Sequence, residues 1–317
     1  MRAVVLDRFG GPEVLQLRDI PAPPDPGPGQ ILVRVHASGT NPVDAKLRQD
    51  ASWAGLRPPL VLGYDASGVV ERVGPGVTDF ARGDEVYFTP EIFGTASGTY
   101  AELTVVPAAI VARKPRNLSH VEASAVPLAG GTAYEAIVRR LQLTVGETIL
   151  IHGGAGGVGS FAVQIAKAMG ARVIATAGRE HQGELKRLGA HVALDYRQGS
   201  IAERVMLETE GRGVDATFDT VGKNVIASFS ATRPFGRVAT ILGASGDLTP
   251  LYMRNLTLHG VFLIRERKRL DELRRMIERG QLSPVIDRTL PMEKVSDAHR
   301  RLDSGHGRGK IVLDIAR

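Results

Sequence analysis

The chain has 317 residues, of which 43% are hydrophobic and 23% charged, and it contains no cysteine. That apolar content is too high for a disordered chain, and the missing cysteines exclude a disulfide scaffold, a four-cysteine zinc lobe and a cysteine nucleophile. No apolar run approaches the roughly 18 residues of a membrane span, and Met1–Asp7 lacks the apolar stretch of a signal peptide, so we expect a cytoplasmic protein.

The net charge of +6, from 40 Lys and Arg against 34 Asp and Glu, raises the question of nucleic-acid binding. The densest basic segment, Arg265–Arg279, is interrupted by acidic residues and carries Leu270, Leu273 and Ile277 at helical spacing. This pattern predicts an amphipathic helix with a charged solvent face, and we expect no nucleic-acid partner. The excess of positive charge also suits a polyphosphate cofactor.

Up to about residue 118, short apolar runs broken by Gly and Pro predict β-strands. Pro21–Gly29 is too rich in proline for a regular element and is expected to be a surface connection. Many short strands with frequent breaks are typical of a small barrel. The expected strands are Arg2–Leu6, Val14–Arg18, Ile31–His36, Ser67–Val73, Glu85–Phe88 and Tyr100–Val105.

From residue 119 to 264 the pattern changes to short buried strands that alternate with helices. Such alternation predicts βαβ units and a parallel sheet. The expected strands are Thr148–His152, Arg172–Ala177, His191–Leu194, Val214–Phe218 and Arg237–Leu242. Residues 265–317 are too few to fold alone, so we expect them to complete the domain of residues 1–118, with residues 119–264 as an insertion.

A glycine-rich turn follows the strand Thr148–His152, with the sequence His152-Gly153-Gly154-Ala155-Gly156-Gly157-Val158-Gly159. Gly154, Gly156 and Gly159 fit G-x-G-x-x-G, in which glycines allow a tight turn, close approach of the backbone to a pyrophosphate, and contact between helix and strand. The helix that follows points free N–H groups at the phosphates. The turn predicts a dinucleotide site over residues 154–159; the alternative is a turn used for packing only.

The end of the second strand of this block bears on the choice between NADH and NADPH. An NAD enzyme places an Asp or Glu about 20 residues after the glycine loop for the ribose 2′-hydroxyl, but residues 175–178 carry no acid. Thr176 and Arg179 would instead offer a neutral pocket and a positive charge to a 2′-phosphate. We therefore expect NADPH as the cofactor, unless Arg179 only caps an exposed loop.

Several stretches along the whole chain share the pattern of one protein family. They are Gly39–Asp44, Gly63–Val70, Pro127–Tyr134, Gly146–His152, Gly156–Gly159 with Gln164 and Lys167, and Gly309–Leu313. With these stretches the chain resembles the zinc-free quinone oxidoreductase (zeta-crystallin) branch of the medium-chain dehydrogenase/reductase superfamily.

The resemblance implies an α/β fold in which a Rossmann doubly wound parallel sheet is inserted into a GroES-like β-barrel domain, with the active site in the cleft between them. It implies NADPH-dependent reduction of a quinone or an α,β-unsaturated ketone as the activity. It also implies a homodimer formed through an edge of the Rossmann sheet, for which Thr257–Ile264 is the candidate strand.

Zinc members of the superfamily hold the metal with a Cys, a His-Glu pair and a further Cys or Asp. The matching positions here are Asn41, Tyr64-Asp65 and the region of Gly130, and they cannot build a three-ligand zinc site. The histidines show no ligand spacing and are interpreted as structural or exposed; they are His36, His120, His152, His181, His191, His259, His299 and His306. We therefore expect no metal, and hydride addition to a conjugated carbon with hydrogen-bond donors for the oxygen that gains charge.

Four residues are candidates for this chemistry. Asn41 is the expected donor to the substrate or to the cofactor ribose, although Asn41-Pro42 is alternatively only a turn. Lys46 resembles the lysine of plant-type enone oxidoreductases, which contacts ribose and substrate oxygen, and Asp44 is a candidate to orient it; the alternative for Lys46 is an exposed helix residue. Tyr64 lines the cleft or packs in the core.

Further cofactor contacts are expected at the carboxyl ends of the parallel strands and at a helix start that faces the phosphates. These residues are Thr132, Val221, Leu242 and Gly243, and the resemblance implies that Tyr196 lies near the adenosine phosphate of the cofactor. Lys310 is expected to close on the cofactor, unless it belongs to a solvated loop. Tyr87–Phe93 is expected either to cover the substrate or to pack as core.

Two alternatives come from other functional classes. A non-catalytic relative, like some crystallins, would bind NADPH without oxidising it with any quinone or enone. A nucleic-acid-associated relative would show binding that weakens steeply with salt. A zinc alcohol dehydrogenase is a third and less favoured alternative.

Overall fold

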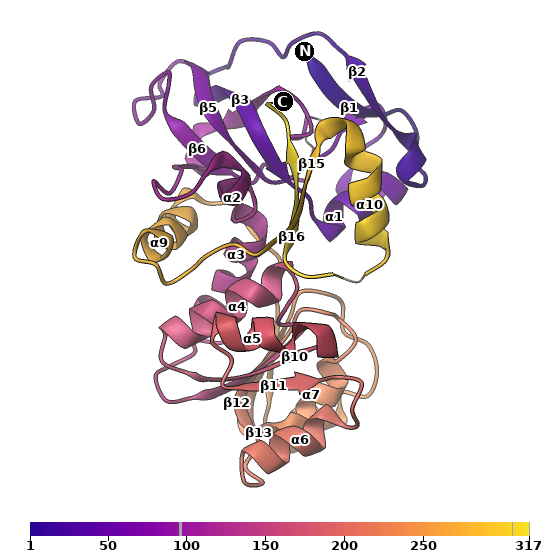
Figure 1. Cartoon of the computed structure of the whole chain (residues 1–317), viewed down its shortest axis with the longest axis vertical. Helices are drawn as coiled ribbons and strands as arrows, with labels where there is room; N and C mark the ends of the chain where they lie inside the picture. The colour runs from indigo at the N-terminus through magenta and orange to yellow at the C-terminus, as the bar shows by residue number, and fades with distance from the viewer. Residues whose placement is uncertain (95–96, 306, 317) are drawn as a thin grey trace. The chain divides into compact units, whose positions relative to one another are not determined.

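The computed structural model describes residues 1–94, 97–305 and 307–316, which form two compact units (Figure 1). The first unit comprises residues 1–128, 264–280 and 284–317, and the second comprises residues 129–263 and 281–283. Helix α2 (His120–Ser124) belongs to the first unit, beyond the boundary expected near residue 118. It does so because Val121 and Ala125 pack against Ala37 and Val312 of that unit.

The first unit is built mainly from antiparallel strands. β1 (Arg2–Leu6) lies between β2 (Leu15–Asp19) and β4 (Leu60–Val61). A larger sheet has the order β15-β16-β3-β5-β6-β8, and β7 also pairs with β3. Its strands are β3 (Gln30–Gly39), β5 (Ala66–Val73), β6 (Glu85–Phe88), β7 (Leu103–Pro107), β8 (Val111–Arg113), β15 (Ile286–Pro291) and β16 (Lys310–Asp314). β16 pairs with β3, so the C-terminal segment lies in the same sheet as the N-terminal strands.

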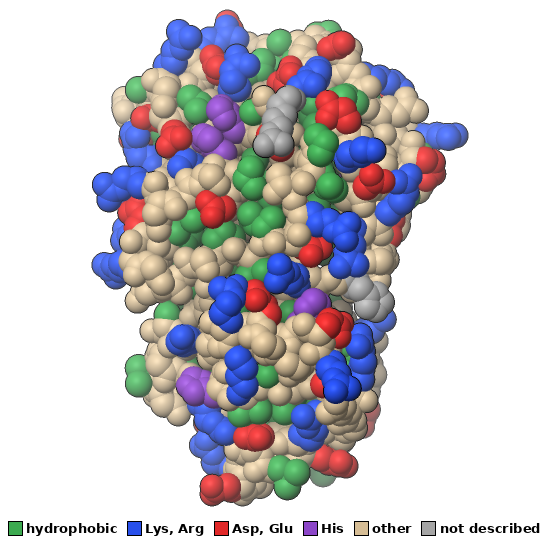
Figure 2. All heavy atoms as spheres, in the orientation of Figure 1, with side chains coloured by type: hydrophobic (Ala, Val, Ile, Leu, Met, Phe, Trp, Pro, Cys, Tyr) green, Lys and Arg blue, Asp and Glu red, His purple; other side chains and the backbone are tan. Residues whose placement is uncertain are grey.

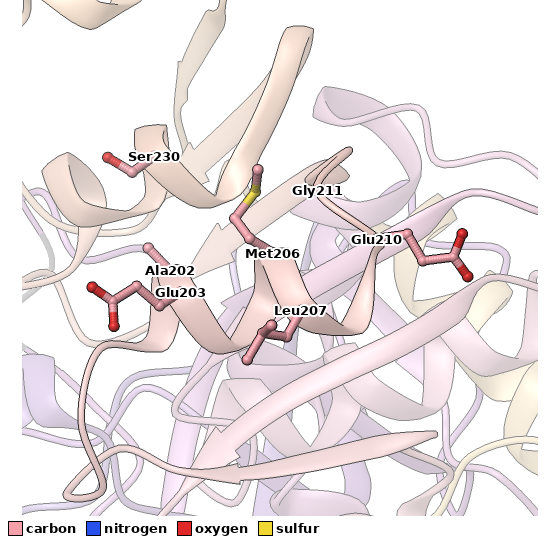
Figure 3. Close-up of a pocket in the computed structure, with 7 residues that line it drawn as sticks. All are labelled: Ala202, Glu203, Met206, Leu207, Glu210, Gly211 and Ser230. Carbon is pink, nitrogen blue, oxygen red and sulfur yellow. The ribbon is translucent and has the colours of Figure 1, made fainter.

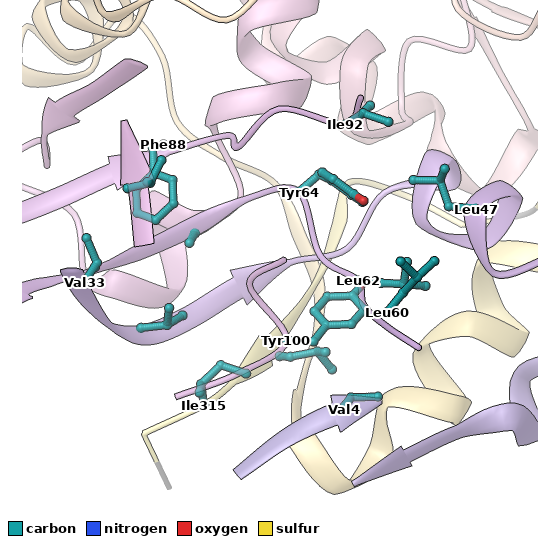
Figure 4. Close-up of a cluster of buried hydrophobic side chains, with 14 of the residues drawn as sticks. Val4, Val33, Leu47, Leu60, Leu62, Tyr64, Phe88, Ile92, Tyr100 and Ile315 are labelled. Atoms are coloured by element: carbon teal, nitrogen blue, oxygen red, sulfur yellow. The ribbon is translucent and has the colours of Figure 1, made fainter. Parts of the chain in front are cut away.

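Helices α1 (Pro42–Gln49), α9 (Arg267–Glu278) and α10 (Val295–Asp303) complete the first unit. On α9 the residues Leu270, Leu273 and Ile277 are buried, as the helical spacing predicts. The core of the unit includes the buried rings of Tyr64 and Tyr100, which Figure 4 shows among apolar side chains such as those of Leu47, Leu60 and Ile92.

The second unit contains a parallel sheet with the order β11-β10-β9-β12-β13-β14. Its strands are β9 (Thr148–His152), β10 (Arg172–Ala177), β11 (Val192–Asp195), β12 (Val214–Asp219), β13 (Thr232–Thr240) and β14 (Thr257–Gly260). Its helices are α4 (Gly157–Ala168), α5 (Gln182–Leu188), α6 (Ile201–Glu208), α7 (Val225–Ala231) and α8 (Thr249–Met253); α3 (Pro127–Tyr134) begins at the junction of the units. The order, with the first strand in the middle, is the doubly wound arrangement expected from the alternating pattern.

The central strands β9, β10 and β12 are almost entirely buried, which explains why their sequences are continuous apolar runs and not alternating ones. Ile149, Leu150 and Ile151 on β9 are fully buried, and Leu150 packs with Ile174 and Leu194 of the neighbouring strands. The central position of β9 places the glycine-rich turn in the middle of the carboxyl edge of the sheet. No helix in the described part of the chain is long and apolar enough to cross a membrane.

Candidate functional site

The glycine loop follows β9, and each glycine meets a different steric demand. Gly153 has a φ of +68°, so the left-handed position that requires glycine lies one residue before Gly154. A Cβ on Gly154 would lie 2.9 Å from Cδ2 of Leu185, and a Cβ on Gly159 would lie 2.1 Å from the carbonyl oxygen of Gly153. A Cβ on Gly156 would meet only that same carbonyl oxygen, at 3.3 Å. The loop is therefore tightly packed at Gly154 and Gly159, and it has free space beside Gly156.

Helix α4 begins at this open side. Its N-cap is Gly156, which has no side chain to accept hydrogen bonds from the first turn. The N–H groups of a first helical turn have no partners within the helix, so those of Gly157 and Val158 are free of both intrahelical and N-cap side-chain acceptors. Open space, unused N–H groups and a positive dipole end fit the pyrophosphate of a dinucleotide.

Thr176 at the end of β10 supports the loop. Its hydroxyl accepts a hydrogen bond from the backbone N–H of Gly153 at 3.2 Å, and its carbonyl accepts one from Gly154 at 2.9 Å. Its side chain is buried and faces the loop. The structure thus gives Thr176 a role in shaping the glycine loop, whereas the sequence predicts an open contact with a 2′-phosphate.

Val221 and Leu242 lie at the carboxyl ends of β12 and β13 and are partly exposed, and Gly243 beside Leu242 is exposed as well. A Cβ on Gly153 would lie 2.8 Å from Cγ2 of Val221, and a Cβ on Gly222 would lie 2.4 Å from Cδ1 of Leu242. The structure therefore brings these three predicted residues to the same edge of the sheet as the glycine loop.

The residues expected near the adenosine end lie on the surface of the second unit. Arg179 follows β10 and is exposed, and its side chain makes no hydrogen bond or ion pair with the described residues. Tyr196 is 49% exposed, and the guanidinium of Arg197 lies 5.2 Å from its ring centroid. Arg197 also pairs with Glu180 at 3.2 Å, so the first acid after β10 already has a cationic partner. Sequence reasoning missed Arg197.

Thr132 and His152 are both buried in the second unit. Thr132 lies in the second turn of α3, which begins at Pro127, so the expected position at the start of the helix is wrong. His152 Nε2 lies 3.1 Å from the Ser228 hydroxyl, and burial lowers the pKa of His152 to about 4. His152 is therefore a neutral core residue, as interpreted.

In the first unit, Asn41 lies at the start of α1 and is buried together with two charged residues. The ammonium of Lys310, at the start of β16, lies 3.0 Å from Oδ2 of Asp65 and also donates to Oδ1 of Asn41. Asn41 Nδ2 donates to Oδ2 of Asp65 at 2.9 Å, and the backbone N–H of Leu128 donates to Oδ1 of Asp65 at 2.7 Å. Asp65 is fully buried and Lys310 is 4% exposed, so Lys310 belongs to the core and not to a solvated loop.

Asp44 has partners other than the one expected from the sequence. Its Oδ2 accepts from the backbone N–H of Asn41 at 2.8 Å and from the hydroxyl of Tyr100 at 2.6 Å, and no described contact joins it to Lys46. Lys46 is exposed on α1, one position beyond the buried Ala45. Asp44 therefore holds the start of α1 instead of orienting Lys46.

A buried chain of polar side chains extends from Asp44. Tyr100 Oη lies 3.4 Å from His299 Nε2, and His299 Nδ1 lies 3.1 Å from the guanidinium nitrogen Nη1 of Arg48. The guanidinium of Arg48 pairs with Asp303 at 2.9 Å. Arginine has no acceptor, so His299 must accept at Nδ1 and carry its proton on Nε2. Burial and the nearby Arg48 lower the pKa of His299 to about 3, and burial raises that of Asp44 to about 7. No sequence motif connects these residues.

Tyr64 and the segment Tyr87–Phe93 combine core and exposed positions. The hydroxyl of Tyr64 is buried and has no hydrogen-bond partner among the described residues, and burial raises the pKa of Tyr64. Tyr87 and Phe88 are fully buried, which favours the core alternative for the first half of the segment. Phe93 is 51% exposed and packs edge-on against Trp53 with ring centroids 6.1 Å apart.

The side chains at the positions that match the zinc ligands do not fit a metal ion. Asn41 and Asp65 are both bonded to the ammonium of Lys310, whose positive charge takes the place of a metal cation. Among the described residues, no group of three or more His, Asp or Glu side chains is arranged to hold a metal; His306 lies outside those residues.

A surface hollow of about 600 Å³ lies on the second unit, and no residue of the glycine loop is among those that line it (Figure 3). Its walls come from α6, the turn after it and α7, and they are mainly apolar. No group of polar side chains converges in it, so it does not resemble a reaction site. The lining residues are Ala202, Glu203, Met206, Leu207, Glu210, Gly211 and Ser230.

Comparison with known proteins agrees with this geometry. Residues 27–116 match the alcohol dehydrogenase GroES-like domain family, and residues 188–313 match the zinc-binding dehydrogenase family. The human quinone oxidoreductase is 33% identical over 99% of this chain and 97% of its own length. The chain belongs to the zinc-free quinone oxidoreductase branch of the medium-chain dehydrogenase/reductase superfamily.

Two further members of this superfamily name a cofactor. The chloroplastic NADPH-dependent alkenal/one oxidoreductase of Arabidopsis thaliana is 35% identical over 99% of this chain and 79% of its own length. A mycobacterial protein whose structure is complexed with NADPH has a TM-score of 0.90 and 30% identity, and the alignment covers 99% of this chain and all of that one. The expected fold class is confirmed, and the chain is an oxidoreductase with a site for a nicotinamide dinucleotide.

Proposed function

We propose that this protein uses NADPH to reduce quinones or α,β-unsaturated carbonyl compounds, without a zinc ion. The names of the human and Arabidopsis relatives support the reaction and its substrate class. One observation carries the metal-free part of the proposal: the Lys310 ammonium is bonded to both Asn41 and Asp65, two of the positions that match the zinc ligands. Bound NADPH would supply the hydride.

The chain's own residues would bind the cofactor and stabilise charge. The open side of Gly156 and the first turn of α4 bind the pyrophosphate. Hydride addition to a conjugated carbon leaves negative charge on a remote oxygen, and one donor to such an oxygen typically lowers the barrier by about 2.7–4 kcal/mol. Both side-chain N–H groups of Asn41 already donate within the protein, to Asp65 and to the Gly39 carbonyl. We therefore favour the exposed Lys46 as the donor.

The test is NADPH consumption with a panel of quinones, enones and simple aldehydes. We expect turnover with the conjugated acceptors and little with the aldehydes, because the latter need a Lewis acid. Lys46→Ala should lower kcat by tenfold or more, and Asn41→Ala should lower it through loss of the buried cluster. Tight NADPH binding without turnover on any acceptor would instead support a non-catalytic NADPH-binding protein.

We propose NADPH over NADH because the first acid after β10, Glu180, is already paired with Arg197, while the side chain of Arg179 has no partner among the described residues. The guanidinium of Arg179 suits a 2′-phosphate, whereas the carboxylate of Glu180 is occupied by Arg197 and is less available to accept a hydrogen bond from a ribose hydroxyl. Equal affinities for NADPH and NADH in a fluorescence titration would contradict the proposal.

We propose a homodimer formed through β14, the last strand of the parallel sheet. An edge strand presents unpaired N–H and C=O groups, and nearby apolar side chains are largely exposed: Tyr252 by 75%, Met253 by 68% and Phe262 by 53%. Sedimentation of the wild type should show a dimer, and Thr257→Lys, which adds a charge at an exposed position of the edge strand, should shift it to monomer.

A nucleic-acid partner remains disfavoured. On the face shown in Figure 2, Lys and Arg side chains are interspersed with Asp and Glu side chains, so single-sign basic stripes do not cover that face. Binding of RNA that weakens steeply with salt would contradict this proposal.

A cytoplasmic location is likewise proposed, and cell fractionation tests it.

A further inference from the structure

The buried lysine of the first unit joins three segments that are far apart in the chain. Asn41 begins α1, Asp65 directly precedes β5 and Lys310 begins β16. Asp65 and Lys310 are 245 residues apart in the chain and 3.0 Å apart in space. All three side chains are at most 4% exposed, so the cluster is shielded from water.

The hydrogen bonds of this cluster fix the orientation of the Asn41 amide. An ammonium can only donate, so the Asn41 oxygen must face Lys310, and the Asn41 nitrogen must face the carboxylate of Asp65 and the carbonyl of Gly39. The opposite orientation would place two donors against each other and two acceptors against each other. The charge of Lys310 therefore fixes one orientation of the Asn41 amide at the start of α1, the helix that carries Lys46.

The same ammonium compensates the buried carboxylate. Burial raises the pKa of Asp65, and Lys310, Asn41 and Leu128 oppose this shift. Other groups close enough to affect the cluster electrostatically are Asp44, Tyr100 and Arg265. Without Lys310, the Asp65 carboxylate would be buried without its counter-charge, which proteins avoid.

We propose that Lys310 is a positioning residue for the reductase reaction: as a built-in cation where zinc members have a metal, it neutralises Asp65 and fixes the amide of Asn41. The role goes beyond charge compensation, because both ends of the Asn41 amide are held in one orientation. This inference rests on the proposed reductase function.

The central experiment compares Lys310→Met with the double variant Lys310→Met/Asp65→Asn. The single variant should lose stability as the pH rises, because deprotonation of Asp65 then leaves an unpaired buried charge. The double variant should recover that stability, since no charge is buried, but its kcat should stay at least tenfold below wild type. KM for NADPH should change much less than kcat.

Lys114→Met is the matched control. Lys114 is a buried lysine of the same unit; it donates to the carbonyl of Leu118 and pairs with Glu85, and it has no contact with Asn41 or Asp65. We expect Lys114→Met to lower the melting temperature and to keep the wild-type kcat and pH profile.

Recovery of wild-type kcat in the double variant would overturn the proposal, because Lys310 would then serve only to offset the charge of Asp65. A second readout does not depend on turnover. In wild type the side-chain amide protons of Asn41 should exchange slowly with solvent, and in the double variant at least tenfold faster, as measured by nitrogen-15 NMR.

Equal exchange rates of these protons in the two proteins would also contradict the role of Lys310. If the wild type fails to oxidise NADPH with every acceptor, the proposed function fails, and the exchange experiment still decides whether Lys310 positions Asn41.

Discussion

The two units build their candidate sites in different ways. In the second unit, the glycine loop offers backbone N–H groups from one continuous stretch, and its shape depends on the absence of side chains at Gly153, Gly154 and Gly159. In the first unit, the cluster around Lys310 is made of charged and polar side chains from distant segments. The glycine loop can be recognised as a motif in the sequence because its residues are consecutive. The cluster around Lys310 cannot, because its residues come together only in the folded chain.

The largest effect is expected in the side-chain network of the first unit. Arg48 is 1% exposed and contacts His299, Asp303 and the carbonyl of Gly10. Because removing one partner of a buried ion pair leaves the other groups unsatisfied, Arg48→Met should lower the free energy of unfolding by about 3 kcal/mol. Urea denaturation measures this loss.

Arg300→Met is the control for that experiment. Arg300 pairs with Asp297 on the surface of α10, and such exposed pairs typically contribute less than about 1 kcal/mol. Equal losses for the two variants would show that the buried network contributes no more than a surface pair.

The variant Gly159→Ala tests the glycine loop, which would bind the cofactor through its backbone N–H groups. The added methyl group would lie 2.1 Å from the carbonyl oxygen of Gly153, and relieving such a contact typically costs about 1–3 kcal/mol. We expect the dissociation constant for NADPH to rise at least tenfold. Gly183→Ala on α5 adds a methyl group that meets nothing within 4 Å and should leave NADPH binding unchanged.

The pH dependence of the free energy of unfolding tests the contribution of Asp44 in the buried network. Burial raises the pKa of Asp44 to about 7, against the hydrogen bonds from Tyr100 and Asn41. Between pH 3.8 and about 7 the folded Asp44 keeps a proton that the unfolded chain releases, so its contribution to stability falls as the pH rises through this range.

Asp44→Asn removes this titration and keeps an acceptor for Tyr100. Its free energy of unfolding relative to wild type should therefore increase by more than about 1 kcal/mol from about pH 4 to about pH 7. Urea titrations across this range provide the comparison, and a constant difference at every pH would show that Asp44 has an ordinary pKa.

The smallest effect is expected at the surface of the second unit. Arg179 is exposed, and exposed ion pairs contribute roughly 0.2–1 kcal/mol, so Arg179→Ala should weaken NADPH binding by about three- to fivefold. NADH binding should not change. Arg187→Ala, which removes a surface partner of Glu184, serves as the control, and an equal loss for NADPH and NADH in Arg179→Ala would exclude a 2′-phosphate contact.

The sequence predicts most of the fold because its patterns are local. Period and punctuation locate β1, β6, β9 and β10 at their observed bounds, and the glycine run identifies the dinucleotide loop. The prediction fails for details that a motif does not specify, namely backbone angles and helix starts. The residue with positive φ is Gly153, and Thr132 lies inside α3 and not at its start.

The first unit shows what sequence patterns cannot supply. Lys310 reads as a residue near the cofactor or in a solvated loop, but its partner Asp65 is 245 residues away, and no spacing rule connects them. Asp44 and Lys46 are neighbours on α1, and only the packing of Tyr100 determines that Asp44 faces the core. Pairing of distant charges depends on the tertiary fold, so it could be found only in the structure.

The most direct test of the account is NADPH oxidation by protein that has been stripped of metal with a chelator and checked by elemental analysis. The account predicts that the metal-free protein reduces a quinone or an enone at the same rate as untreated protein, and that added zinc does not raise this rate. Loss of turnover on chelation, with recovery on addition of stoichiometric zinc, would contradict it.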